Sequence, residues 1–298
     1  MASRAYEIRP GEALHDGLRR AAKGRASKAI ERLEDADEDF AAAVHGARKD
    51  LKKLRSLIRL VRAGLGEKAY RAENDRFRAV AGSLGGARDA EAKLECLSAL
   101  REHYGGEFPT RWSGDFVGAL EAERDRIAAQ EAETGTGAAV AAIEEGLEAI
   151  DDWKLKPHGF GLAAPGLERA YRRGRERFRD VLDDPSDVAV HEWRKRAKDL
   201  WYQLQLLQDG WPAVLGAVSA QAHELSAILG DHHDLAVVRE DAEARSDLFG
   251  GEAQAQLLEL LARRQGELTE QAAPFGRRLY AEKPGRFVDR VGAYWATR

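Results

Sequence analysis

The chain has 298 residues, a formal net charge of −4 and 33% charged residues. Cys96 is the only cysteine, which excludes an intrachain disulfide and fits a reducing compartment. No charge-free apolar run approaches the roughly 18 residues of a membrane-spanning helix, and the N-terminus lacks the apolar core of a secretory signal, so we expect a soluble, cytoplasmic protein with no membrane partner.

Ala, Leu, Arg and Glu dominate the composition and no useful strand alternation occurs, so we predict an all-α fold. Proline and glycine breaks divide the chain into predicted helices. In chain order these are residues 11–34, 38–64, 68–84, 88–104, 113–133, 138–151, 166–182, 186–209, 212–229, 233–247, 252–272 and 285–296. All eight prolines, including Pro109 and Pro274, are expected at helix starts or in connections.

A basic pattern, H-x-x-R-K-x-x-K, occurs twice, each time inside a predicted helix. The two copies are His45, Arg48, Lys49, Lys52 and His191, Arg194, Lys195, Lys198. A Leu-Gly pair follows each copy at nearly the same offset, Leu84-Gly85 and Leu229-Gly230. Two landmarks repeated in the same order indicate an internal duplication. We therefore predict one domain over residues 1–298 made of two pseudo-symmetric antiparallel helical bundles, residues 10–151 and 163–298, with the motif helices at their junction.

The first motif helix carries a basic stripe. At about 100° per residue, one face about 20 Å long collects the following side chains: Arg48, Lys52, Arg55, Arg59 and Arg62, with His45 at its edge. Asp50 is the only acid between Arg48 and Arg62, so these like charges destabilise the helix unless an anion or partner relieves them.

The second copy has a shorter stripe, because the positions of Arg55, Arg59 and Arg62 are taken by Trp201, Gln205 and Gln208. The two stripes are predicted to line a central basic groove, with most of the charge from the first helix. Arg173, in the basic segment 171–175, is a further candidate for this groove. A solvated helix face is the alternative interpretation for all these residues.

Each Leu-Gly pair is predicted to close a helix, with the glycine in the left-handed conformation. Arg88-Asp89 and His233-Asp234 would then begin the next helix, where the acids act as caps or orient basic side chains. The run His232-His233-Asp234 suggests a metal site. However, successive helical side chains point about 100° apart, so we expect neither a metal site nor a cofactor.

These motifs resemble those of the CHAD family, the conserved histidine α-helical domain, from about Glu12 to Trp295. The resemblance implies a duplicated helical-bundle fold that binds inorganic polyphosphate through a basic central surface. Its anion contacts would carry over to His45, Arg48, Lys52, Arg55, Arg88, His191, Arg194, Lys198 and His233. Trp201 stands where relatives often have a basic residue, which predicts a weaker second half-site. Some relatives carry a fused triphosphate-tunnel domain, which we do not expect here.

We therefore expect a non-enzymatic polyphosphate-binding protein with no catalytic residue. The predicted site consists of His45, Arg48, Lys49, Lys52, Arg55, Arg59, Arg62, Arg88, Arg173, His191, Arg194, Lys195, Lys198 and His233. Polyphosphate-metabolising proteins and polyphosphate granules are the partners and location that this function suggests.

Two alternatives stay open. One is a metal-dependent phosphohydrolase acting on polyphosphate or a phosphorylated substrate through His232, His233 and Asp234. The other is a binder of nucleic acid or acidic protein that uses the same stripe. Few aromatic residues accompany the stripe, so we expect no specific nucleic acid.

Overall fold

The computed structural model describes residues 6–36, 39–108, 113–249 and 251–298. Its α-helices are α1 (Leu14–Glu34), α2 (Phe40–Leu60), α3 (Arg62–Leu65), α4 (Glu67–Ser83), α5 (Gly86–Tyr104), α6 (Ser113–Thr134), α7 (Gly137–Asp151), α8 (Ala164–Asp183), α9 (Asp187–Leu207), α10 (Pro212–Ala244), α11 (Gly251–Leu279) and α12 (Pro284–Ala296). No strand occurs in the described ranges, which confirms the all-α prediction. Within the same ranges, each helix is too short or too polar to span a bilayer.

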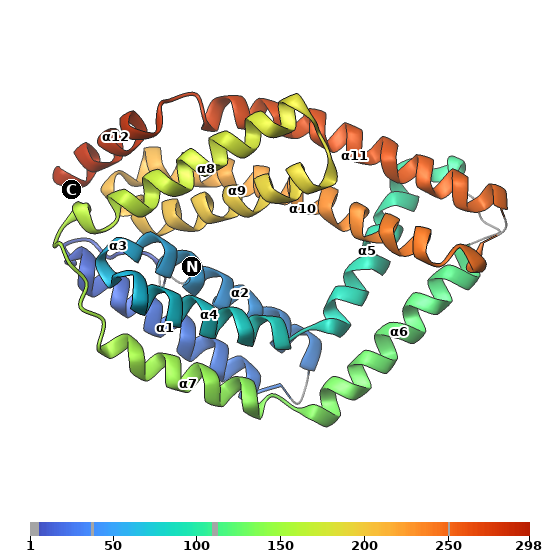
Figure 1. Cartoon of the computed structure of the whole chain (residues 1–298), viewed down its shortest axis with the longest axis horizontal. Helices are drawn as coiled ribbons and strands as arrows, with labels where there is room; N and C mark the ends of the chain where they lie inside the picture. Colours follow the sequence, from blue (N-terminus) through green and yellow to red (C-terminus); the bar gives the residue numbers. More distant parts are fainter. Residues whose placement is uncertain (1–5, 37–38, 109–112, 250) are drawn as a thin grey trace.

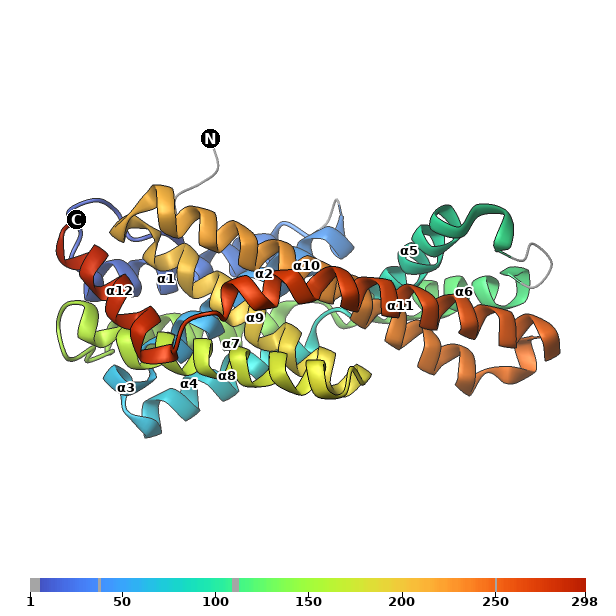
Figure 2. The same cartoon turned by 90° about the horizontal axis from the view of Figure 1, so that it is seen from above.

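The helices form two groups that lie side by side (Figures 1 and 2). Helices α1, α2, α4 and α7 pack together, and α8, α9, α10, α11 and α12 form the second group. Helices α2 and α9, which carry the two motifs, meet between the groups. Helix α5 leaves the first group and packs against α10 and α11, so the two predicted repeats interlock. Their pseudo-symmetry stays a prediction.

Both motif helices begin at a side-chain cap. Asp39 accepts a hydrogen bond from Ala42 N at 2.9 Å before α2, and Ser186 accepts from Ala189 N at 3.4 Å before α9. Both helices bury an apolar face, which consists of Leu51, Leu54, Ile58, Ala197, Leu200 and Leu204. This burial orients each motif helix, so its basic residues lie beside the core-facing side.

The first Leu-Gly pair ends a helix as predicted, but the second does not. Helix α4 ends at Ser83, Gly85 has φ +96°, and α5 begins at Gly86. Helix α10, in contrast, runs without a break through Leu229-Gly230, so the predicted end at residue 229 is wrong. A single interior glycine costs only about 1 kcal/mol. Burial of helix side chains on both sides of Gly230, including Leu225 and Leu235, outweighs that cost. His233 and Asp234 therefore lie in mid-helix.

Two further helix boundaries differ from the predictions. Pro274 lies inside α11, which continues to Leu279, so its predicted place in a connection is wrong. The predicted helix 38–64 is interrupted at Val61, where α2 ends and α3 follows. Pro109 and the predicted helix start at residue 38 lie outside the described residues.

The contact of α8 with α2 depends on Gly166. A Cβ atom at this position would lie 2.6 Å from both Cα and the carbonyl carbon of Leu60, which is backbone that cannot rotate away. We expect Gly166→Ala to lower the free energy of unfolding by about 1–3 kcal/mol, because the two helices must separate.

Urea denaturation measures this change. Gly24→Ala in α1 is the matched control, since its Cβ would meet no atom within 4 Å, and it should stabilise the protein by up to about 1 kcal/mol. Equal stability of Gly166→Ala and the unsubstituted protein would contradict the close approach.

Candidate anion-binding site

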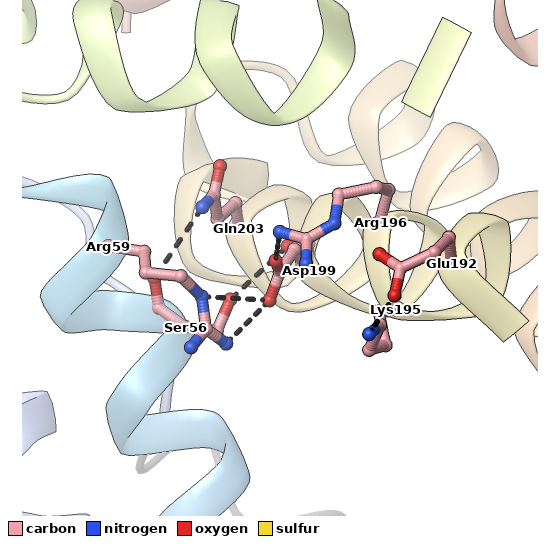
Figure 3. Close-up of polar contacts among 7 residues, drawn as sticks. All are labelled: Ser56, Arg59, Glu192, Lys195, Arg196, Asp199 and Gln203. Atoms are coloured by element: carbon pink, nitrogen blue, oxygen red, sulfur yellow. Dashed lines mark hydrogen bonds and ion pairs between the residues drawn. The ribbon is translucent and has the colours of Figure 1, made fainter. Parts of the chain in front are cut away.

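A cluster of ion pairs around Asp199 of α9 joins the two motif helices (Figure 3). Arg59 of α2 donates to Asp199 Oδ1 from Nε at 3.1 Å and from Nη2 at 2.6 Å, and Arg196 Nη1 donates to Oδ2 at 3.1 Å. Ser56 Oγ donates to Asp199 O at 3.3 Å. Only 9% of the Asp199 side chain is exposed. The cluster therefore holds α2 against α9 through charge-assisted hydrogen bonds.

Toward the N-terminal ends of both helices, Lys52 of α2 and Lys198 of α9 lie in one cationic environment. Burial lowers the pKa of Lys52, and the neighbouring Arg48 and Arg194 lower it further. Burial, followed by Arg194, Lys52 and Lys49, lowers the pKa of Lys198 to about 8. Lys52, the last lysine of the first motif, is thus among the cations that act on Lys198, the last lysine of the second.

Several of these cations have no acid partner. Among the described residues, Lys49, Lys52, Arg55, Arg194 and Lys198 form no ion pair within 4.0 Å. Lys195, in contrast, pairs with Glu192. Three of these unpaired cations lie on α2 and two on α9, so both motif helices contribute free positive charge.

Each motif arginine packs against the glycine of its own Leu-Gly pair. Arg48 Nη1 donates to Gly85 O at 2.9 Å, and a Cβ atom at Gly85 would lie 2.8 Å from Arg48 Cδ. Arg194 Nε lies 3.7 Å from the corresponding Cβ position at Gly230. In both arginines Nε is buried without a hydrogen-bond partner. The repeated Leu-Gly pairs therefore leave room for the guanidinium groups.

Acidic side chains of α5 pair with two arginines of the predicted site. Arg48 pairs with Asp89, and Arg88 pairs with Glu95 through two contacts of 2.8 Å. The predicted role of Asp89 in orienting a basic side chain is thereby confirmed. The expectation that only a bound anion or partner relieves the stripe is wrong, because acids that lie far from α2's motif in the sequence already do so in part.

The motif histidines are neutral near pH 7. His191 Nδ1 and His233 Nδ1 lie 3.2 Å apart, and burial followed by Arg194 lowers the pKa of His233 to about 4. Partial burial, followed by neighbouring cations, also lowers the pKa of His191 and His45. These residues therefore offer hydrogen bonds at neutral pH rather than charge.

His232 does not join this group, because it is buried with 3% exposure while His233 faces His191. Within the described ranges, no group of three or more His, Cys, Asp or Glu side chains is arranged to hold a metal ion.

Arg59, Arg62 and Arg173 lie around a small cavity of about 30 Å³ between α2, α3, α4, α8 and α9. Arg62 pairs with Glu67 and stacks over the ring of Tyr70 at 4.4 Å. Arg55 lies next to Arg59, and burial followed by this neighbour lowers its pKa to about 10. The predicted stripe is therefore divided into an N-terminal part near Lys198 and a C-terminal part on this cavity.

The small cavity also includes Arg169, which the sequence analysis did not include in the site. Its position four residues before Arg173, on the same face of α8, was the available signal.

The chain was compared with known proteins. A protein-family model described as "CHAD domain" matches residues 20–243. Among solved structures, PptA from Streptomyces chartreusis superposes with a TM-score of 0.65 at 17% sequence identity, over 90% of this chain and 99% of that chain. At this identity the likeness shows the fold alone. A search of curated proteins found no match.

The Asp199 cluster yields a stability prediction. Asp199→Ala leaves Arg59 and Arg196 next to each other without a counter-charge, so we expect a loss of about 2–4 kcal/mol of unfolding free energy. Glu67→Ala is the control. It removes the acid partner of Arg62, but the Glu67 side chain is 46% exposed, so the loss should be much smaller than that of Asp199→Ala. Similar urea midpoints for the two variants would show that Asp199 does not hold the helices together.

Proposed function

The chain belongs to the CHAD family, and from this premise we propose that it binds inorganic polyphosphate through a basic groove between α2 and α9. The observation that carries the proposal is the meeting of Lys52 and Lys198, the last lysines of the two motif copies, without an acid partner. Bringing two half-buried ammonium groups together costs free energy, which an anion between them recovers.

The proposed mechanism is multivalent electrostatic binding. Lysine ammonium groups act as point charges on successive phosphates, and the Arg194 guanidinium can take two phosphate oxygens at once. Each neutralised phosphate releases condensed counterions, as on a nucleic-acid backbone. The neutral ring of His191 or His233 adds a hydrogen-bond donor. Such a site favours a linear chain of phosphates over orthophosphate.

We propose that binding is not accompanied by catalysis, because His232 and His233 face different surroundings and the described residues hold no group of three or more His, Cys, Asp or Glu side chains placed for a metal ion. A metal-dependent phosphohydrolase would instead release phosphate in a reaction that a chelator and His233→Ala both abolish. If the protein were a nucleic-acid binder, RNA would displace bound polyphosphate at equal phosphate concentration. We also propose a cytoplasmic location and an association with polyphosphate granules and polyphosphate-metabolising enzymes.

The first test is a salt titration of long-chain polyphosphate binding. We expect affinity to fall steeply with salt, and the Lys52→Ala/Lys198→Ala variant to bind more weakly with a slope reduced by about one unit per lysine. The matched control is Lys68→Ala/Lys154→Ala, which removes two exposed lysines outside the groove. Equal losses in the two variants would assign the effect to net charge and remove the groove from the proposal.

The second test is pH dependence. The pKa of Lys198 is lowered to about 8, and a bound phosphate raises it again, so binding takes up a proton. Affinity should therefore be highest below this pKa and fall about tenfold between pH 7 and 9. The internal phosphates of the chain stay ionised over this range.

Lys198→Arg keeps its charge across this range and should flatten the profile, as measured by calorimetry in buffers of different ionisation enthalpy. An unchanged profile in that variant would mean that Lys198 does not face the ligand.

A further inference from the structure

The two motif copies hold their arginines differently. Arg48 is engaged by both carboxylate oxygens of Asp89, at 2.9 Å from Nη1 and 3.2 Å from Nη2. Its counterpart Arg194 forms no ion pair among the described residues. Asp234 stands at the position that corresponds to Asp89 and lies near Arg194, but no pair within 4.0 Å joins them.

The reason for this difference lies in the helix break. After Gly85 the chain starts a new helix, and Asp89 in its first turn reaches back to Arg48. In the second copy α10 continues through Gly230, so Asp234 is fixed on a straight helix.

The next pair in the motif follows the same pattern. Arg88 is held by Glu95, whereas the corresponding His233 lies against His191. The guanidinium groups of Arg48 and Arg88 in the first half-site are thus occupied in the free protein, while Arg194 in the second half-site is open.

We propose that Asp89 is a specificity-determining residue that makes the first half-site available only to an anion with enough linked phosphates to displace it. This inference rests on the proposed function. A short anion bound by Arg194, Lys198 and Lys52 gains little additional binding free energy from contacts in the first half-site. A longer chain anchored there presents its next phosphates to Arg48 at high effective concentration and replaces the carboxylate.

Exposure determines which partner moves. The Asp89 side chain is 65% exposed, but Arg48 is only 17% exposed and is also fixed to Gly85 O. The carboxylate can therefore swing into water while the guanidinium stays in place. Because an exposed ion pair of this kind is weak, linked phosphates can replace it.

The test compares Asp89→Asn with Asp234→Asn by calorimetry, using tripolyphosphate and long-chain polyphosphate. Both substitutions remove one acid near the same cations, but only Asp89 holds an arginine. We expect Asp89→Asn to tighten tripolyphosphate binding about fivefold, and long-chain binding by less, so that chain-length discrimination shrinks. Asp234→Asn should change either affinity by about twofold at most.

Three results would overturn the inference. Equal effects of Asp89→Asn and Asp234→Asn would mean that only net charge matters. Weaker binding by Asp89→Asn would make Asp89 a residue that positions Arg48 for the ligand. Glu95→Gln, which frees Arg88, should act in the same direction as Asp89→Asn, and circular dichroism checks that each variant is folded. If the unsubstituted protein binds neither ligand, the proposed function itself fails. If it binds the long chain but Asp89→Asn changes nothing, only the role of Asp89 is refuted.

Discussion

One buried carboxylate, Asp199, allows two cationic helices to pack together. It neutralises an arginine from α2 and another from α9, at a place where like charges would otherwise push the helices apart. In the motif alignment Asp199 takes the position that Lys53 holds in the first copy. The two copies therefore carry opposite charges at this position. The negative charge in the second copy serves helix packing, whereas its positive counterpart in the first copy lies on the helix of the proposed ligand surface. The C-terminal part of the stripe is used for packing, and the N-terminal part keeps unpaired cations.

The all-α fold and the orientation of α2 and α9 could be predicted from sequence, because helical periodicity determines which residues share a face. Leu84-Gly85 and Leu229-Gly230 look alike, yet only the first ends a helix. Glycine is a weak breaker, and tertiary burial decides whether the helix continues. The acid that holds Arg59 could not be identified either, since periodicity on one helix does not say which distant carboxylate will meet it. For the same reason, the division of the stripe between two places became visible only in three dimensions.

At neutral pH, like charges repel one another where α2 and α9 meet. Lys52 and Lys198 are half-buried beside like charges, and the motif histidines lose their protons so that they do not add to the repulsion. The formal net charge of the chain is −4, so the remainder of the protein repels polyanions on average. The unpaired cations of α2 and α9 are therefore a local concentration of positive charge in a chain that is acidic overall.

Helix α5 has a consequence for how the chain is made. Its partners lie far along the sequence, with Lys93 Nζ 2.8 Å from Asp241 Oδ2 and Tyr104 Oη 2.9 Å from Glu267 Oε1. During synthesis α5 leaves the ribosome long before α10 and α11 exist to cover it. The N-terminal half must therefore wait for most of the C-terminal half before its tertiary contacts are complete. The contacts of α5 with α10 and α11 therefore tie the completion of the N-terminal part of the fold to the synthesis of the C-terminal part.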